Sequence, residues 1–199
     1  MRTSAPLVAV LALAASMAAA GERATIPALP GIAVNQAPAA IPDFTLTDQA
    51  GKPRAFSSLR GGPALVFFGF THCPNICPTT LGQLKMLHAY GNGSLKAARV
   101  VLISVDGDRD TPARLKSYLA PLSADFIGLT GDPKEASRIA AQFAAVFFKE
   151  PAAKDGSYNV MHSTQVYAID KAGQLRATFN DASIEDMAKV TALLLAEPG

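Results

Sequence analysis

A nearly unbroken run of apolar residues at positions 64–70 constrains this chain more than any other feature. Such a run is typical of a central strand that is buried on both faces of a sheet. Leu81, Leu84 and Leu87 follow at helical spacing, so a helix is predicted directly after the strand. A strand buried on both faces needs other elements above and below it, and the chain is therefore predicted to form an α/β layer structure.

The rest of the chain alternates strand and helix signals in the same way. Capping residues followed by proline, at Thr111 and Asp132, predict the starts of two further helices. This order predicts a thioredoxin-like fold, with a mixed central sheet flanked by helices and an N-terminal β-hairpin. The other expected elements are a small hairpin at 44–56, strands at 100–105 and 126–129, a second hairpin at 164–179, and a last helix from Ser183 to Leu195.

The ends of the chain suggest how it is organised and where it acts. Residues 1–20 contain Arg2, an apolar run and three alanines before Gly21, which predicts a signal peptide or, if uncleaved, an N-terminal anchor. Residues 21–42 are rich in proline and alanine and predict a linker, followed by one domain over residues 43–199. The net charge of only +2 gives no electrostatic reason to expect nucleic-acid binding. We expect an exported, periplasmic protein, free or held at the inner membrane by its N-terminus.

Two cysteines, Cys73 and Cys77, lie between the predicted strand and helix. In an oxidising compartment such a pair forms a disulfide, a redox couple or a metal site. A structural disulfide over so short a loop would add little stability. Residues four apart face the same side of a helical turn, and the start of a helix favours thiolates. The sequence therefore predicts two reactive sulfurs that converge on one point.

Three residues between the cysteines leave space for an ion. Two thiolates select copper(I) or zinc, and a structural zinc site normally has four protein ligands, so copper is favoured. The third ligand is expected to be a histidine. His72 is predicted to hold its loop by a hydrogen bond, and His88 to be solvated on the first helix. His162, far along the chain, is left undecided by the residues alone.

Several short segments carry a family resemblance: Gly-Phe-Thr-His-Cys-Pro at 69–74, Cys-Pro-Thr-Thr-Leu at 77–81, Ser-Val-Asp at 104–106, Arg-Asp-Thr-Pro at 109–112, Gly-Leu-Thr-Gly at 128–131 and His-Ser at 162–163. Between about residues 41 and 195 the chain resembles the Sco/SenC copper-binding assembly factors of cytochrome c oxidase. The resemblance implies one copper ion, as Cu(I) or Cu(II), bound by Cys73, Cys77 and His162. It also implies a metallochaperone, not an enzyme, that receives copper from an exported donor and serves the dinuclear copper centre of oxidase subunit II.

Two other functions remain open on the same residues. A thiol:disulfide reductase would use Cys73 and Cys77 as a dithiol to keep acceptor cysteines reduced, with copper incidental. A thiol peroxidase would use one exposed cysteine of low pKa. Copper binding depends on His162, whereas thiol exchange does not, so a His162 substitution separates the chaperone from the reductase.

Three positions depart from the pattern of the family, which usually has tyrosine at Phe70, an acidic residue at Asn75 and proline at Gly107. Phe70 lacks a hydroxyl that could support the site. Asn75 lacks a negative charge between the cysteines, which should lower the pKa values of the thiols. None of the three is an expected ligand.

Features near the expected site have simpler interpretations. Asp106, Asp108 and Asp110 predict loop and helix-cap chemistry, because Arg109 lies among them and no downstream glutamate completes a calcium loop. Met161 should point away from His162 and pack in the core. Residues 147–148 are also predicted to be core residues. Residues 150–158 are predicted to form a loop beside His162.

Overall fold

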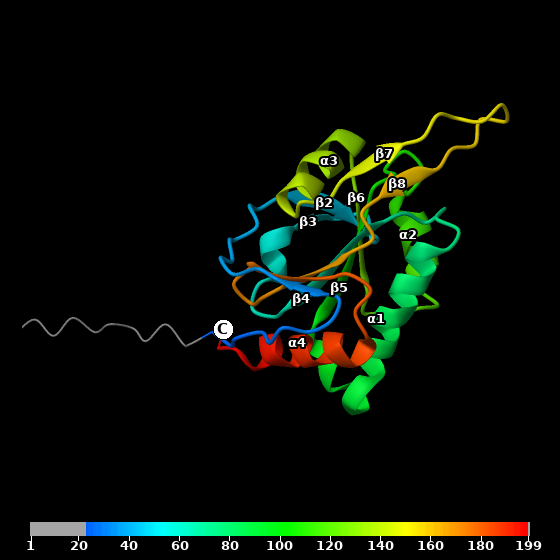
Figure 1. Ribbon diagram of the computed structural model, residues 1–199. Helices are drawn as coiled ribbons and strands as arrows, with labels where there is room; N and C mark the ends of the chain where they lie inside the picture. Colours follow the sequence, from blue (N-terminus) through cyan, green and yellow to red (C-terminus); the bar gives the residue numbers. More distant parts are fainter. Residues whose placement is uncertain (1–22, 199) are drawn as a thin grey trace, which may run out of the picture.

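The apolar run forms β4 (Ala64–Gly69), in which every residue is buried. β4 pairs in parallel with β5 (Arg99–Ser104) on one side and antiparallel with β9 (Val166–Ile169) on the other. It is therefore an internal strand, as predicted. The computed structural model describes residues 23–198, and Figure 1 shows β4 and β5 in the middle of the domain. The predicted signal peptide, residues 1–20, lies outside the described residues. Within residues 23–198, no helix combines the length and the apolar character needed to cross a membrane.

The main sheet is mixed. In spatial order the strands are β1 (Ile32–Val34), β10 (Leu175–Phe179), β9, β4, β5, β6 (Ile127–Thr130), β2 (Thr45–Asp48) and β3 (Pro53–Ala55). β4, β5 and β6 run parallel, and the remaining neighbours are antiparallel. The predicted N-terminal hairpin is present as β2 and β3, and it extends the sheet because β2 also pairs with β6.

Helices cover both faces of this sheet, as a thioredoxin-like fold requires. The α-helices are α1 (Ile76–Gly93), α2 (Pro112–Leu119), α3 (Pro133–Gln142) and α4 (Ile184–Ala196). Figure 1 shows α3 on one side of the sheet and α1, α2 and α4 on the other. Two short 3-10 helices, Phe56–Leu59 and Ser94–Ala97, connect strands and helices.

The helix ends follow from local sequence. Thr111, Asp132 and Ser183 precede α2, α3 and α4, and each side-chain oxygen accepts a hydrogen bond from a backbone N–H of the first turn. These contacts satisfy donors that have no partner inside the helix. The regular part of α1 ends before Gly91 and Asn92, whose φ angles of 59° and 60° are left-handed. The cap and termination signals of the sequence are confirmed.

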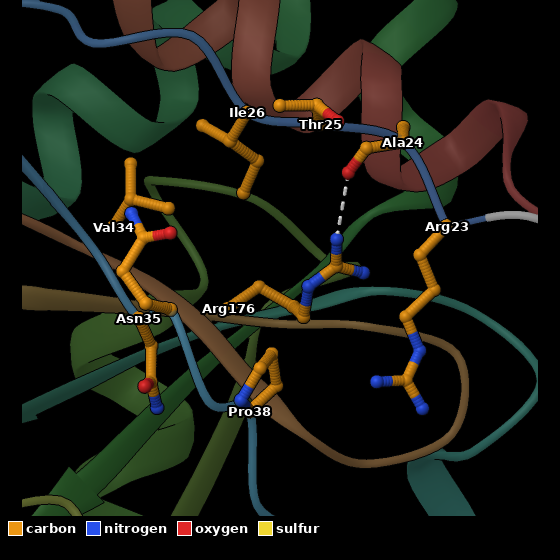
Figure 2. A pocket seen from close by; sticks show the side chains of 9 residues that line it. Arg23, Ala24, Thr25, Ile26, Val34, Asn35, Pro38 and Arg176 are labelled. Carbon is orange, nitrogen blue, oxygen red and sulfur yellow. Dashed lines mark hydrogen bonds between the residues drawn. The ribbon is translucent and has the colours of Figure 1, made fainter.

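The segment predicted as a linker differs in the structure. Within it, β1 pairs with β10, and Ile26 and Ile41 are buried in the core. The guanidinium of Arg176 donates to the carbonyl oxygen of Ala24 at 2.9 Å (Figure 2) and is paired with the Glu197 carboxylate at 2.7 Å. Over residues 23–42 the chain is extended but belongs to the domain. Short apolar pairs separated by prolines were too brief to indicate this.

A second, two-stranded sheet stands apart from the main one. It consists of β7 (Phe147–Lys149) and β8 (Val160–His162), joined by residues 150–159, which contain the loop predicted at 150–158. Figure 1 shows this hairpin projecting from the body of the domain. Phe148 lies opposite Met161, and both side chains are exposed. Their prediction as core residues is wrong, because the hairpin packs against the domain with only one of its faces.

Candidate metal centre

The first cysteine lies in the turn between β4 and α1. The spacing predicted that both cysteines lie in one helical turn. Cys73 instead precedes the helix, because α1 begins at Ile76. Its backbone N–H donates to the Phe70 carbonyl oxygen at 3.3 Å. The backbone N–H of Cys77, in the first turn of α1, donates to Cys73 Sγ at 3.4 Å. The positive end of the helix therefore points at this sulfur and can stabilise the negative charge it carries when bound to a metal.

The second cysteine is completely buried. Burial, followed by the hydrogen bond with Cys73, raises the pKa of the Cys77 thiol far above its ordinary value. The expectation that both sulfurs are thiolates in the free protein is therefore wrong for Cys77, because desolvation outweighs the helix start. Cys77 must lose its proton when a metal ion binds.

His162, at the end of β8, turns its imidazole toward the cysteines. Its Nε2 lies 3.5 Å from Cys77 Sγ, and its Nδ1 lies 2.9 Å from the Ser163 carbonyl oxygen. Since a carbonyl oxygen only accepts, Nδ1 carries the proton, and the Nε2 lone pair faces the sulfurs. Burial lowers the pKa of His162 below its ordinary value, which keeps the ring neutral. Both effects prepare His162 to act as a metal ligand.

The structure thus brings Cys73, Cys77 and His162 together: one donor atom from each lies within 4.8 Å of the others. Two sulfurs and one imidazole nitrogen form a soft donor set that fits copper(I). Gly69 leaves room for it, since a Cβ at this position would lie 3.0 Å from Cys77 Sγ. The rings of Phe67 and Phe70 stand edge-on to the His162 imidazole at 5.9 and 5.7 Å and shield it from water.

The other two histidines do not join this group. His72 is exposed, and its Nδ1 lies 3.2 Å from Thr71 Oγ1, in agreement with the predicted loop-holding role. His88 was expected at the surface but is buried on α1, with Nε2 2.8 Å from the Ala98 carbonyl oxygen. That expectation is wrong because the N–H group of the ring finds a buried acceptor, which removes the need for water.

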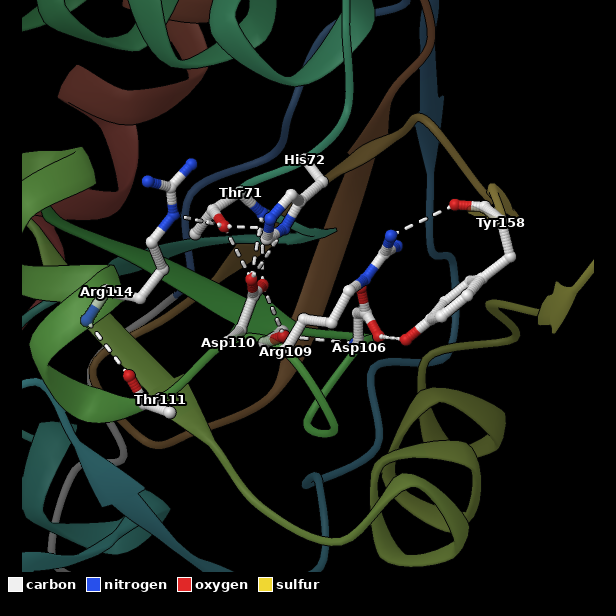
Figure 3. Close-up of polar contacts among 9 residues, drawn as sticks. Thr71, His72, Asp106, Arg109, Asp110, Thr111, Arg114 and Tyr158 are labelled. Atoms are coloured by element: carbon white, nitrogen blue, oxygen red, sulfur yellow. Dashed lines mark hydrogen bonds and ion pairs between the residues drawn. The ribbon is translucent and has the colours of Figure 1, made fainter. Parts of the chain in front are cut away.

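A polar network supports the cysteine side of the centre. Asp110 is fully buried, and its carboxylate accepts hydrogen bonds from Thr71 N at 3.0 Å, Thr71 Oγ1 at 2.6 Å and Ser104 Oγ at 2.7 Å. His72 lies 3.8 Å from the same carboxylate. Figure 3 shows the Asp110 carboxylate next to Thr71 and His72. His72, Asp106 and Asp110 also lie close enough together to bind a metal ion. However, both carboxylates already accept hydrogen bonds from protein donors.

A second part of this network reaches the histidine side. Asp106 accepts hydrogen bonds from Arg109 Nε at 2.5 Å and from the Tyr158 hydroxyl at 2.8 Å. The predicted loop role is thus confirmed for Asp106 and Asp110, but the cap of α2 is Thr111 and not one of these aspartates. Their link to Thr71 and Tyr158 was missed by sequence reasoning, because residues up to 52 positions apart are involved. The alternation of aspartates after a buried strand was the available signal.

The fold and this centre define a class: a thioredoxin-like protein with two cysteine sulfurs and one imidazole at a single point. The chain belongs to the SCO1/SenC family, whose sequence model matches residues 33–195. It is 36% identical over 148 residues to an SCO2-like protein of Rickettsia conorii, covering 73% of this chain and 72% of that protein.

Solved structures agree with this assignment. The structure of Bradyrhizobium japonicum ScoI with copper bound has a TM-score of 0.70 and 38% identity, over 79% of this chain and 100% of that one. BsSco, a Sco-family cytochrome c oxidase assembly protein in which a disulfide switch has been identified, has a TM-score of 0.65 and 26% identity. The similarity to BsSco covers 82% of this chain and 98% of that one.

Proposed function

We propose that this protein is an exported copper metallochaperone that delivers copper to, or helps assemble, the dinuclear copper centre of cytochrome c oxidase subunit II. The observation that carries the proposal is the convergence of Cys73, Cys77 and His162 within 4.8 Å. Copper bound to a family member with 38% identity supports it. One copper ion per chain is expected from one set of three ligands.

The burial of the three ligands suggests an order of transfer. Cys77 is fully buried, Cys73 lies at the edge of the core, and His162 is partly exposed. An incoming ligand of the acceptor therefore replaces His162 or Cys73 first and Cys77 last. Transfer by ligand exchange needs no free copper ion and no net redox change, so the protein acts as a carrier and not as an enzyme.

Anaerobic copper(I) titration of the reduced mature protein tests the binding step. We expect saturation at about one copper per chain, and at least about tenfold weaker binding in Cys73→Ser and His162→Ala. Met86→Ala removes an exposed thioether of α1 that lies outside the ligand group and its supporting contacts, and it serves as the control. Saturation of the unmodified protein at less than about half an equivalent would contradict the proposal. Mixing the loaded protein with the copper-free soluble domain of subunit II then tests delivery.

The compartment forms part of the same proposal. The pattern of residues 1–20 supports export to the periplasm, with the N-terminus either cleaved or retained at the inner membrane. Fractionation of cells that express the full chain tests this: periplasmic or membrane recovery is expected, and recovery in the cytoplasm would contradict it. An exported copper donor follows from this location.

A thiol:disulfide reductase is the second candidate. Both cysteines are free thiols close enough to pair, and a disulfide switch is known in BsSco. In this function, two electrons and two protons pass from Cys73 and Cys77 to an acceptor disulfide, which becomes two thiols. Cys73, the less buried sulfur, attacks first. His162→Ala would leave this exchange nearly intact while impairing copper binding.

A further inference from the structure

The cysteine half and the histidine half of the centre come from distant parts of the chain, but one short segment contacts both. Residues 106–110 follow β5. Asp110 holds Thr71, two positions before Cys73. Asp106 and Arg109 of the same segment hold Tyr158, four positions before His162. Figure 3 shows both sets of contacts on the same segment. Residues 106–110 therefore connect the cysteine half of the centre to the histidine half.

Several side chains contact Tyr158. Its hydroxyl donates to Asp106 Oδ1 at 2.8 Å, and its carbonyl oxygen accepts from Arg109 Nη1 at 3.1 Å. The Arg109 guanidinium and the Lys149 ammonium each lie 3.6 Å from the centroid of its ring. Burial, followed by the bond to Asp106, raises the pKa of Tyr158 to about 12, so the hydroxyl stays a donor at neutral pH.

The hairpin that carries His162 depends on such a contact. β7 and β8 form a two-stranded sheet outside the main sheet, and a two-stranded hairpin is only marginally stable alone. Residues 151–157 of its loop are all exposed, and Tyr158 is the first partly buried residue after them. The chain is thus fixed at Tyr158 immediately before it enters β8.

We propose that Tyr158, clamped by Asp106 and Arg109, is the positioning residue that sets the distance between His162 Nε2 and the two sulfurs. Tyr158 does not touch the metal site itself. Release of this clamp lets His162 withdraw while copper stays on the two thiolates, and so it controls how fast copper leaves. This inference rests on the proposed copper-binding function.

The test compares copper(I) transfer from the loaded full-length protein to a high-affinity chelator. Tyr158→Phe removes only the hydroxyl, and Tyr158→Ala removes the ring as well. We expect release about tenfold faster in Tyr158→Ala and a smaller increase in Tyr158→Phe, by analogy with groups that orient metal ligands. Tyr90→Phe, at an exposed tyrosine near the end of α1, is the matched control and should match the unmodified protein.

A double substitution separates positioning from general stability. If Tyr158 acts through His162, then Tyr158→Phe and Tyr158→Ala will not change release further in a His162→Ala background. The copper(II) absorption spectrum gives a second readout, since the thiolate-to-copper band should shift in Tyr158→Phe while the unfolding temperature of the copper-free protein stays nearly constant.

The outcomes distinguish the two proposals. Failure of the unmodified protein to take up copper would overturn both. Normal uptake with unchanged release and spectra in both Tyr158 variants would overturn the positioning role alone. So would an acceleration that persists in full without His162. If Tyr158→Ala does not fold, Tyr158→Phe, which keeps the packed ring, decides the question.

Discussion

Cys77 Sγ and His162 Nε2 lie 3.5 Å apart, and the rings of Phe67 and Phe70 pack against the imidazole. The two groups differ in what they need before they can bind a metal. Burial keeps the Cys77 thiol protonated and the His162 imidazole neutral. His162 is therefore ready as a ligand at neutral pH, whereas Cys77 must first release a proton.

Copper affinity should consequently rise with pH across the neutral range. Since the free Cys77 thiol is protonated there, copper(I) binding releases at least one proton, and affinity should increase by about tenfold per pH unit for each proton released. Titrations against a competing chelator at several pH values measure this slope. Affinity that does not change with pH would mean that Cys77 is already a thiolate or does not bind the ion.

Much of this architecture follows from local physics. The apolar run of β4 has one stable location, between other strands, and the caps at Thr111 and Asp132 act within one turn of their helices. Such features depend on neighbours in sequence and could be predicted. The convergence of Cys73 and Cys77 was also predictable, because four positions separate them.

Features that depend on distant partners could not be predicted in this way. The sequence predicted His88 at the surface, because its buried hydrogen-bond acceptor, the Ala98 carbonyl oxygen, is known only from the folded structure. The sequence predicted Phe148 and Met161 as core residues, because it does not show that one face of the β7–β8 hairpin is exposed. The place of His162 required the family resemblance, since only the folded chain brings β8 to the cysteines.

His88 should make the protein sensitive to acid. Burial lowers its pKa below the ordinary value of 6.5. Above this pH, the folded and unfolded states both hold the ring neutral; below it, the unfolded chain takes up a proton that the folded chain resists. Stability should therefore fall as the pH drops through 6.5 toward the folded-state pKa. Urea unfolding above and below this pH should show a smaller loss in His88→Gln, whose amide can still donate to Ala98. An identical loss in both proteins would exclude His88 as the cause.

Asp110→Asn should destabilise the turn that presents Cys73. The asparagine amide N–H₂ would face donors, so Thr71 or Ser104 would lose its acceptor inside the protein. A buried donor left without a partner costs about 1 to 3 kcal/mol, and copper affinity should fall as the turn loosens. Chemical denaturation and copper titration measure the two effects. Asp108→Asn is the matched control on the same loop: its side chain is 57% exposed, and a change within about 0.5 kcal/mol is expected. Equal stability of the two variants would contradict this role for Asp110.

Gly69→Ala tests the space around the buried sulfur. The added Cβ would lie 2.7 Å from Phe67 Cε1 and 3.0 Å from Cys77 Sγ, so the Phe67 ring and the Cys77 side chain must shift. Overpacking of this kind costs about 1 to 3 kcal/mol, and displacement of Cys77 should also weaken copper binding. Gly82→Ala is the control, because nothing lies within 4 Å of a Cβ at this position in α1. Alanine favours a helix over glycine by about 0.5 to 1 kcal/mol, so Gly82→Ala should stabilise the protein and leave its copper affinity unchanged. If Gly69→Ala binds copper as tightly as the unmodified protein, Cys77 does not need its present position, and the close packing of β4 against α1 does not shape the site.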